Sequence, residues 1–551
     1  MADRDDTPQD PAAPESPAAP DDASAASAPE TGIVESEVPA AGAVASSDVA
    51  ATDLESQARD AEHAARASAA RKGASRRAAL LGLRVATGVI GVLAAGATVA
   101  AVGLVPLPSI DAEPAAVTVT PVAADQLRVC PGSGLRLGDE AGQDAANASA
   151  VGRPSVSGFA SAGDLERETV AGAAAPDGGA SAPEELRLTP DDDALVAGAQ
   201  SQSFSASDLD GFAASSCDEP GSSSWIVGGA TTVGRTSILT LTNPTDVDAT
   251  VELRVLTEGG DVSAPGLSGI IIGPGAQRVL PLAGFARDLV SPVIQIESRG
   301  GQVVPFLQQS TLRAIDPGGV DIVGETAAPS TEIVIPGVTL VDVEATARAM
   351  AEEGYEDLGA IVRVAVPGDE PATARVAVTP EGEDVDAATT SEIDLAAGRV
   401  TDIPLEEVGD GRFTVTITAD VPVVAAARAA TAGPPSGGAP DTDFAWFAGA
   451  SLLDGDVLVS VPTGPSARLT LQNPGGEDAE VRIARAGGEG GRSVTVPAGS
   501  TVSTGLGGNA GYQLVGSEGL RASVTLAGPA SIASFPVAPA RPVSGPIVVR
   551  P

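Results

Sequence analysis

The chain has 551 residues, a formal net charge of -41 and an isoelectric point close to 4.1. A surface this acidic repels nucleic acid, which we exclude as a partner. Hydrophobic residues make up 43% of the sequence but aromatic residues only 2%, so a core must be built from valine, isoleucine, leucine and alanine. Small β-branched residues suit sheets, and the length allows three or four domains. We therefore expect a mainly β protein.

The N-terminal region divides into an acidic and a basic part. Residues 1–58 are rich in alanine, proline, serine and acidic residues and hold hardly any large apolar side chain. We expect them to form a disordered acidic tail. From 59 to 84 the composition becomes basic and favours helix, which indicates a juxtamembrane helix close to anionic head groups.

An uncharged segment follows this basic part. Residues 85–105 read VATGVIGVLAAGATVAAVGLV, about the length that a helix needs to cross the hydrocarbon core of a bilayer. Because the basic residues precede the segment, the positive-inside rule places the tail in the cytoplasm and the body outside. A cleaved signal peptide is the alternative, since Ala95-Gly96-Ala97 fits a cleavage site, but signal peptides have shorter apolar cores. We expect a single-pass protein of the cell membrane.

Residues 106–224 are rich in glycine, alanine, serine and aspartate. We interpret them as a stalk that is largely irregular between its two cysteines. Cys130 and Cys217 both fall outside the membrane in this topology, where disulfides persist, so we expect them to be paired. Two unpaired thiols are the alternative, and two thiolates without a nearby histidine fall short of a zinc site.

An internal repeat marks the rest of the chain. Three segments share a proline, then an alanine, then alternating apolar positions, and further on a glycine and a leucine at a common spacing. The residues are Pro244, Ala249, Val251, Leu253, Gly275 and Leu282; Pro367, Ala372, Ala374, Val376, Gly398 and Leu405; and Pro474, Ala479, Val481, Ile483, Gly499 and Leu506. An apolar period of two between frequent turns is typical of half-buried antiparallel strands.

The repeat predicts three tandem, immunoglobulin-like antiparallel β-sandwiches at 225–316, 317–432 and 433–551. Trp225 and Trp446 are each followed by a glycine at the same spacing, and we expect each to mark an opening strand. The stretch 343–358, VEATARAMAEEGYEDL, has a helical pattern. We interpret it as a crossover or packing helix inserted in the second sandwich, with a separate binding element as the alternative.

The part of the chain that follows the predicted membrane span contains few side chains of the kinds that catalyse reactions. The single histidine, His63, precedes the predicted membrane span, which excludes histidine-dependent nucleophilic catalysis and histidine metal sites in the body. We therefore predict no catalytic residue, no metal and no cofactor, although a pair of carboxylates remains possible chemistry for a hydrolase. Phe444, Trp446 and Phe447 form the densest aromatic cluster. We favour a core element between sheets there, with a partner-binding patch as the alternative.

Several segments of the body resemble a known family. They are WIVGGATTVGR from Trp225, LTNP from Leu241, APGLSG from Ala264, PGGVD from Pro317 and DFAW from Asp443. Over roughly Cys217 to the C-terminus the chain is similar to a family of large actinobacterial membrane proteins of unknown function. The resemblance implies a single-span exported protein encoded among cell-envelope genes, and it implies no active site.

These observations lead to three hypotheses about function. The first is a non-enzymatic, membrane-anchored envelope protein that acts as a scaffold or binding module for another envelope protein or a surface glycan. The second is a glycan-binding or sensing protein whose cytoplasmic tail recruits a partner. The third is a hydrolase that uses two carboxylates.

Overall fold

The computed structural model describes residues 117–119, 125–138, 147–170, 182–189, 194–383, 387–405, 408–433, 439–488, 490–539 and 547–549. The predicted tail (1–58), juxtamembrane helix (59–84) and membrane span (85–105) lie outside the described residues. No helix in the described part is long and apolar enough to cross a membrane. The chain divides into two units, Met1–Asp111 and Ala112–Pro551, and every strand below belongs to the second unit.

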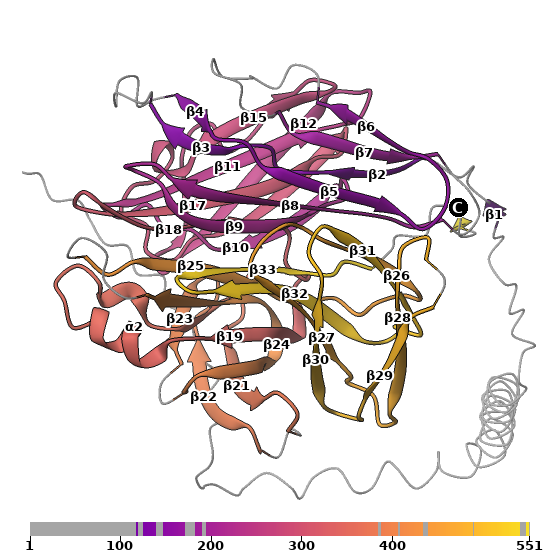
Figure 1. The fold of residues 1–551 in the computed structure, drawn as a ribbon. Coiled ribbons are helices and arrows are strands. Elements are labelled where there is room, and N and C mark those ends of the chain that lie inside the picture. Colours follow the sequence, from indigo (N-terminus) through magenta and orange to yellow (C-terminus); the bar gives the residue numbers. More distant parts are fainter. Residues whose placement is uncertain are drawn as a thin grey trace, which may run out of the picture. The chain divides into compact units, whose positions relative to one another are not determined.

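The described part is mainly β, as predicted, and its strands fall into four groups along the chain (Figure 1). Group 2, residues 223–323, is the first group along the chain in which both sheets have at least four strands. Its strands are β10 (Ser223–Val227), β11 (Arg235–Asn243), β12 (Ala249–Thr257), β13 (Gly260–Asp261), β14 (Ile270–Ile272), β15 (Ala276–Pro281), β16 (Val293–Gly300), β17 (Val304–Arg313) and β18 (Asp316–Val323), with a 3-10 turn, η1 (Leu282–Gly284). They form two antiparallel sheets, one ordered β10-β16-β12 with β13 and β14 on β12, the other β15-β11-β17-β18.

Groups 3 and 4 repeat this order. Group 3 contains β19 (Ser330–Leu340), β20 (Ile361–Ala365), β21 (Ala372–Pro380), β22 (Thr389–Leu395), β23 (Val400–Pro404), β24 (Gly411–Ala432) and β25 (Thr442–Ala448). Group 4 contains β26 (Val457–Val461), β27 (Ser466–Gln472), β28 (Ala479–Arg485), β29 (Arg492–Val496), β30 (Thr501–Leu506), β31 (Ala510–Val515), β32 (Arg521–Gly528) and β33 (Ser531–Pro536). The sheets of group 4 are β26-β31-β28-β29 and β30-β27-β32-β33. In group 3 the long β24 serves both sheets, β19-β24-β21-β22 and β23-β20-β24-β25.

Group 1 corrects the prediction of an irregular stalk at 106–224. Its strands are β2 (Gln126–Val129), β3 (Gly134–Leu137), β4 (Ala148–Val151), β5 (Ser155–Ala160), β6 (Leu165–Thr169), β7 (Glu184–Leu188), β8 (Val196–Ser205) and β9 (Asp210–Cys217). The pairings β2-β7-β6 and β5-β8-β9 match β10-β16-β12 and β11-β17-β18 of group 2, and β3 and β4 form a separate hairpin. The stalk region therefore has the same strand arrangement with smaller sheets, and its glycine- and serine-rich composition hid the apolar period.

The predicted disulfide is confirmed, because Cys130 and Cys217 are bonded. The bond joins the residue after β2 to the last residue of β9, and both cysteines are buried beside Leu186, Leu188 and Val196. It therefore ties the first strand of group 1 to the last.

The repeated residues lie at equivalent places in groups 2, 3 and 4. The repeat alanines Ala249, Ala372 and Ala479 are the first residues of β12, β21 and β28. The two apolar positions after each alanine are buried in all three strands. The repeat glycines Gly275, Gly398 and Gly499 all have positive φ, between 61° and 68°. Glycine adopts this conformation without steric cost, so each marks the turn into the next strand.

Two predicted boundaries were wrong by one strand. The strand β18 pairs with β17, and β25 pairs with β24, so each closes the group before it. The boundaries thus shift from 316 to after Val323 and from 432 to after Ala448. Trp225 lies on an opening strand as predicted, but Trp446 lies on the closing strand β25. The shared tryptophan–glycine spacing led to the wrong assignment of Trp446, because apolar and polar residues alternate in the same way in a closing strand and in an opening strand.

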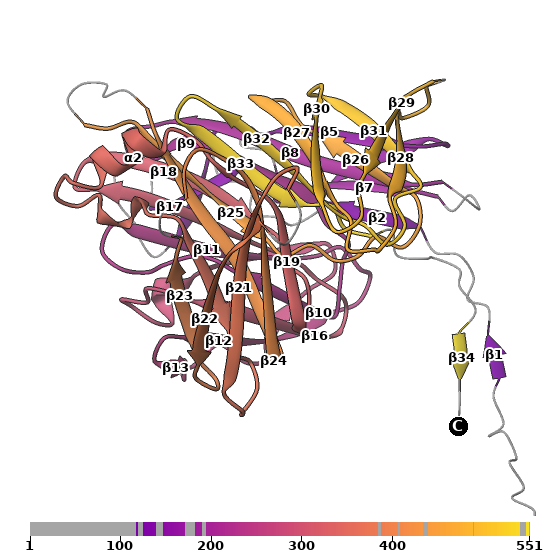
Figure 2. The same ribbon diagram turned by 90° about the horizontal axis from the view of Figure 1, so that it is seen from below.

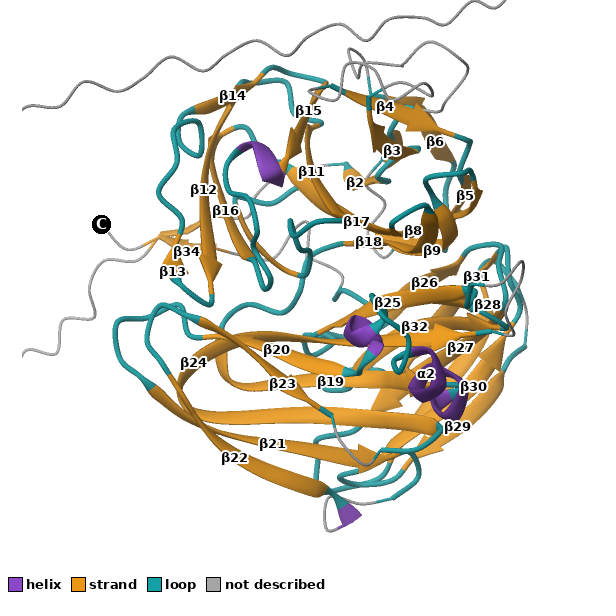
Figure 3. Ribbon diagram, turned by 90° about the vertical axis from the view of Figure 1, so that its left-hand side faces the viewer, coloured by secondary structure: helices purple, strands orange, loops and turns teal. Residues whose placement is uncertain are grey.

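The helix predicted at 343–358 is shorter than expected. α2 spans Val343–Ala349, and after a turn the 3-10 segment η2 spans Glu356–Leu358. Gly354, with φ of 90°, lies in the turn between them. Both segments are inserted between β19 and β20 of group 3, as predicted. The helix α2 is drawn in purple in Figure 3.

The last strands of the four groups meet at one place. β9 packs against β18 and β33, and β25 packs against the same two strands, so β9, β18, β25 and β33 form a closed four-strand junction (Figure 1). Neighbouring groups also share hydrophobic cores. Pairs that share a core are Phe204 with Val320, Trp225 with Trp446, Phe447 with Ile532, and Phe212 with Leu526. The groups therefore close a ring in the order 1-2-3-4.

Two short strands lie outside the groups. β1 (Val117–Val119) pairs antiparallel with β34 (Ile547–Val549), side by side in Figure 2. The start and the end of the described part thus meet.

We predict that truncation of the repeat's core positions destabilises the protein. Leu253→Ala and Ile483→Ala remove buried side chains and should each lower the free energy of unfolding by about 2–5 kcal/mol. The control Arg375→Ala removes a side chain exposed on β21 and should change it by less than about 0.5 kcal/mol. Urea denaturation measures all three, and equal effects for core and surface variants would contradict the register.

Candidate functional site

A single carboxyl group lies at the centre of the four-strand junction. Asp443, on β25, is fully buried. Its Oδ2 accepts hydrogen bonds from the backbone N–H of Phe212 on β9 and of Ile532 on β33, both 3.1 Å. Its Oδ1 accepts from the backbone N–H of Val320 on β18, 3.3 Å. One side chain thus binds a strand of each of the other three groups.

A second buried carboxyl group supports the first. Asp321 on β18 accepts from the backbone N–H of Trp446 on β25, 2.7 Å, and from that of Ile322. Burial raises the pKa of Asp321 to about 7, against the lowering effect of these hydrogen bonds. Burial also raises the pKa of Asp443 well above its ordinary value, and the charge of Asp321 adds to the rise.

Two glycines allow the strands to come this close. A Cβ at Gly211 would lie 2.7 Å from Oδ1 of Asp443, and a Cβ at Gly319 would lie 2.7 Å from the ring of Phe444. Both glycines also have positive φ, 139° and 111°, which side chains other than hydrogen disfavour. The Asp-Gly-Phe and Pro-Gly-Gly-Val-Asp segments are therefore dictated by packing at the junction.

The aromatic residues proposed as a partner patch lie in the interior. Phe444, Trp446 and Phe447 are each about 1% exposed, which corrects the patch alternative and agrees with the core element that we favoured. The indole N–H of Trp446 donates to Oε1 of Gln309, 2.8 Å. Because the strand lies at the junction, alternate side chains enter the cores of groups 2 and 3 instead of facing solvent.

Arginines cover two of these rings and border an open cleft. The guanidinium of Arg363 lies 4.6 Å from the ring centre of Trp446, and that of Arg428 lies 5.2 Å from that of Phe444. Such stacking is a favourable cation–π contact. The cleft lies between groups 2 and 3 and encloses about 340 Å³, lined by residues that include Arg235, Arg363, Arg428, Asp357 and Trp446.

Three arginines of the cleft region converge on one carboxylate. Asp357, on η2, lies 2.7 Å from Nη2 of Arg235 on β11, 2.7 Å from Nη2 of Arg313 on β17 and 3.6 Å from Nη2 of Arg428 on β24. Burial raises the pKa of Asp357, but the charges of Arg428 and Arg313 outweigh it and hold the pKa at about 2. Burial lowers the pKa of Arg428 to about 10, and the other arginines contribute to the fall.

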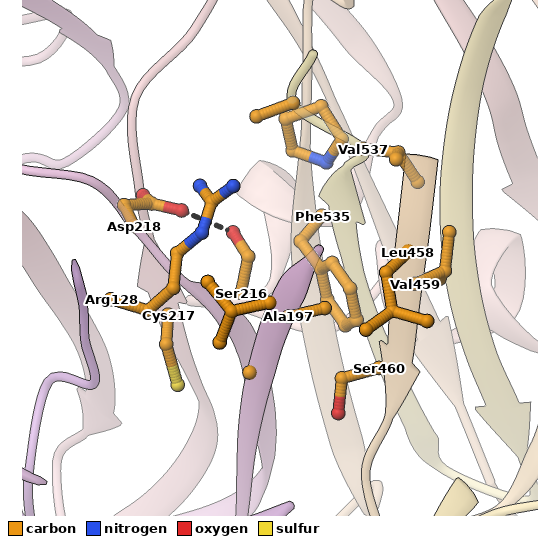
Figure 4. A pocket seen from close by; sticks show the side chains of 14 residues that line it. Arg128, Ala197, Ser216, Cys217, Asp218, Leu458, Val459, Ser460, Phe535 and Val537 are labelled. Carbon is orange, nitrogen blue, oxygen red and sulfur yellow. Dashed lines mark hydrogen bonds between the residues drawn. The ribbon is translucent and has the colours of Figure 1, made fainter. Parts of the chain in front are cut away.

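A smaller pocket lies between groups 1 and 4, next to the disulfide (Figure 4). Arg128, Ser216 and Asp218 line one side of it and Leu458, Val459 and Phe535 the other. Its charges are matched within the protein: Arg128 pairs with Glu219 at 2.9 Å, and Ser216 donates to Asp218 at 2.6 Å. At about 40 Å³ this pocket has room for little more than water.

Metal binding has no support in the described part of the chain, where no three His, Cys, Asp or Glu side chains group to hold an ion. Asp357 and its arginines were missed in the sequence because they come from β11, β17, β24 and η2, far apart in the chain. The available signal was the helical segment 343–358, which contains Asp357. Asp321 and Asp443 were likewise detectable as single acidic residues inside apolar strands.

The buried carboxyl groups predict that stability rises as the pH falls below neutrality. In the unfolded chain Asp321 titrates near pH 4, but in the folded chain its pKa is about 7. Protonation of Asp321 therefore contributes on the order of 4 kcal/mol to the free energy of unfolding. This contribution is complete below about pH 4 and is lost as the pH rises through about 7. Denaturant unfolding of the wild type and of Asp321→Asn between these pH values measures it. The variant should show the weaker pH dependence; identical slopes would contradict the assignment.

Comparison with known families and proteins places the chain in a family without giving it an activity. A family described as being of unknown function, DUF5719, matches residues 170–506. The match begins in group 1 and ends with β30 of group 4, so it includes most of the ring. No curated protein matches the chain. Because the match covers more than half of its length, the chain belongs to the DUF5719 family of unknown function.

Proposed function

We propose that this protein is a non-enzymatic, membrane-anchored scaffold or binding protein of the cell envelope, with the ring of strand groups outside the membrane. The observation that carries the proposal is the four-strand junction, where Asp443 binds backbone N–H groups of three other strands. Separating any group would leave buried hydrogen-bonding groups unpaired. A body of this kind holds its outer surfaces at constant positions, which is what a scaffold requires.

The extracytoplasmic location draws support from the disulfide and from the sequence. A buried bond between Cys130 and Cys217 suits an oxidising compartment, because cytosolic thiols are kept reduced. The acidic tail, basic segment and uncharged segment 85–105 occur in the order expected for a cytoplasmic N-terminus.

We further propose that the four strand groups descend from one immunoglobulin-like sandwich by duplication. The recurring order of strands within both sheets supports this proposal, as do the alanines and positive-φ glycines at equivalent positions of groups 2, 3 and 4. The hydrolase hypothesis gains nothing from the most perturbed carboxyl groups, since Asp321 and Asp443 are fully buried and bonded to backbone N–H groups.

Reporter fusions to the full-length chain test the location. Alkaline phosphatase fused after Pro551 should be active, and a reporter that needs the cytoplasm should be inactive at the same position. In the same cells, alkylation without reduction should leave both cysteines unmodified. Activity of the cytoplasmic reporter alone, or two freely alkylated cysteines, would reject the proposal, as would a mature N-terminus after Ala97.

A further inference from the structure

Group 3 has a longer connection between its first two strands than groups 2 and 4 have. Residues 341–360 separate β19 from β20, whereas only 228–234 separate β10 from β11 and 462–465 separate β26 from β27. In repeat proteins, insertions in single copies form loops on one face, which is often the binding face. This insertion brings Met350, Glu356 and Asp357 to the cleft between groups 2 and 3.

The charges in the cleft differ from those of the chain as a whole. The protein carries a net charge of -41, yet Arg235, Arg313 and Arg428 share the single carboxylate of Asp357. Buried charges are normally paired, because desolvation of an unpaired charge is costly. The three arginines outnumber the one carboxylate that they share, while Asp402 in the same cleft is paired with Arg363 and Glu356 is exposed. The cluster around Asp357 is therefore positively charged in itself, which favours a further anion.

Arg363 shows what a fully paired arginine looks like in the same cleft. Its Nε and Nη2 bind both carboxylate oxygens of Asp402, 2.8 and 2.9 Å. Its remaining hydrogens go to the carbonyl groups of Gly229, Pro292 and Val290 across the boundary with group 2. This arginine joins the two groups and has no hydrogen left for a ligand.

Arg428 is different, although its side chain is nine-tenths buried. Its Nη2 donates to the backbone carbonyl of Asp357, 2.8 Å, but its Nε has no hydrogen-bond partner among the described residues. A buried guanidinium with an unused donor is costly unless another group supplies an acceptor. Arg428 lines the cleft and its side chain is about one-tenth exposed, so a ligand in the cleft meets the exposed part of the side chain, whereas Nε itself is buried.

The rest of the cleft is suited to an apolar group. Met350, Ile361 and Pro404 line it, and Val290 at its edge is 54% exposed. Its volume, about 340 Å³, falls within the range of small-molecule sites, about 300–1,000 Å³. We propose that this cleft binds an organic anion, in which a carboxylate or phosphate meets Arg428 and Arg235 and a small apolar body contacts Met350 and Ile361. The inference rests on the proposed binding role and names its ligand class.

Calorimetry on the purified full-length protein in detergent tests the site. The probes are benzoate and phenyl phosphate, with benzyl alcohol as a neutral aromatic control of similar size. We expect at least one anion to bind and the alcohol not to bind. Binding of benzoate alone or of phenyl phosphate alone tells whether the ligand carries a carboxylate or a phosphate. No binding of either anion, or equal binding of the alcohol, would overturn the inference.

Matched variants locate the binding. Arg428→Gln should weaken it about ten- to a hundredfold, the value of a hydrogen bond to a charged group. The control Arg485→Gln changes an exposed arginine that also stacks on a ring, that of Tyr512, and should leave binding unchanged. Equal effects of the two would overturn the inference.

A third variant keeps the test decisive if Arg428→Gln does not fold. Glu356 is exposed and lines the cleft, so Glu356→Gln removes a repelling charge and should tighten anion binding. Weaker or unchanged binding would overturn the inference. Because the assay uses purified protein, failure here leaves the membrane topology standing, and a failed topology leaves this result unaffected.

Discussion

The structure depends on one buried carboxyl group that accepts hydrogen bonds from three strands of three different groups. Among the described residues, the hydrogen-bond partners of Asp443 are the backbone N–H groups of Phe212, Val320 and Ile532, and none is a cation. Burying such a group costs free energy unless every partner stays in place. The four groups are therefore coupled, because moving one strand removes a partner from a group that solvent does not reach.

This coupling explains why group 1 is retained although its two main sheets have only three strands each. It keeps the strands that match β10-β16-β12 and β11-β17-β18, including β9, which closes the junction. Sheets with fewer strands bury less apolar surface, so the group is less stable by itself. The disulfide between Cys130 and Cys217 joins its first and last strands and offsets this deficit, since a bond that closes a long loop destabilises the unfolded chain.

The features of the fold and of the cleft that could be predicted from the sequence are those that leave a pattern in neighbouring residues. The register of β12, β21 and β28 followed from the alternation after Ala249, Ala372 and Ala479, because period-two burial is a local property. Group 1 escaped detection because β2 to β7 have only four to six residues each and are separated by glycine- and alanine-rich segments without the proline–alanine spacing. The closing strands were assigned to the wrong group because pairing partners are chosen by tertiary packing. The arginines and the aspartate of the cleft come from four elements that are far apart in the chain, so no local sequence pattern predicts the cleft.

Native-state hydrogen exchange at the amides of Phe212, Val320 and Ile532 tests the account most directly, because these three donors belong to three groups and share one acceptor. Amides that open only with the whole cooperative unit exchange at the rate of global unfolding. The account predicts that all three exchange slowly and together in the wild type, and that Asp443→Ala speeds all three. Exchange of one of them by local opening, while the other two stay protected, would show that the strand groups are independent and would contradict the account.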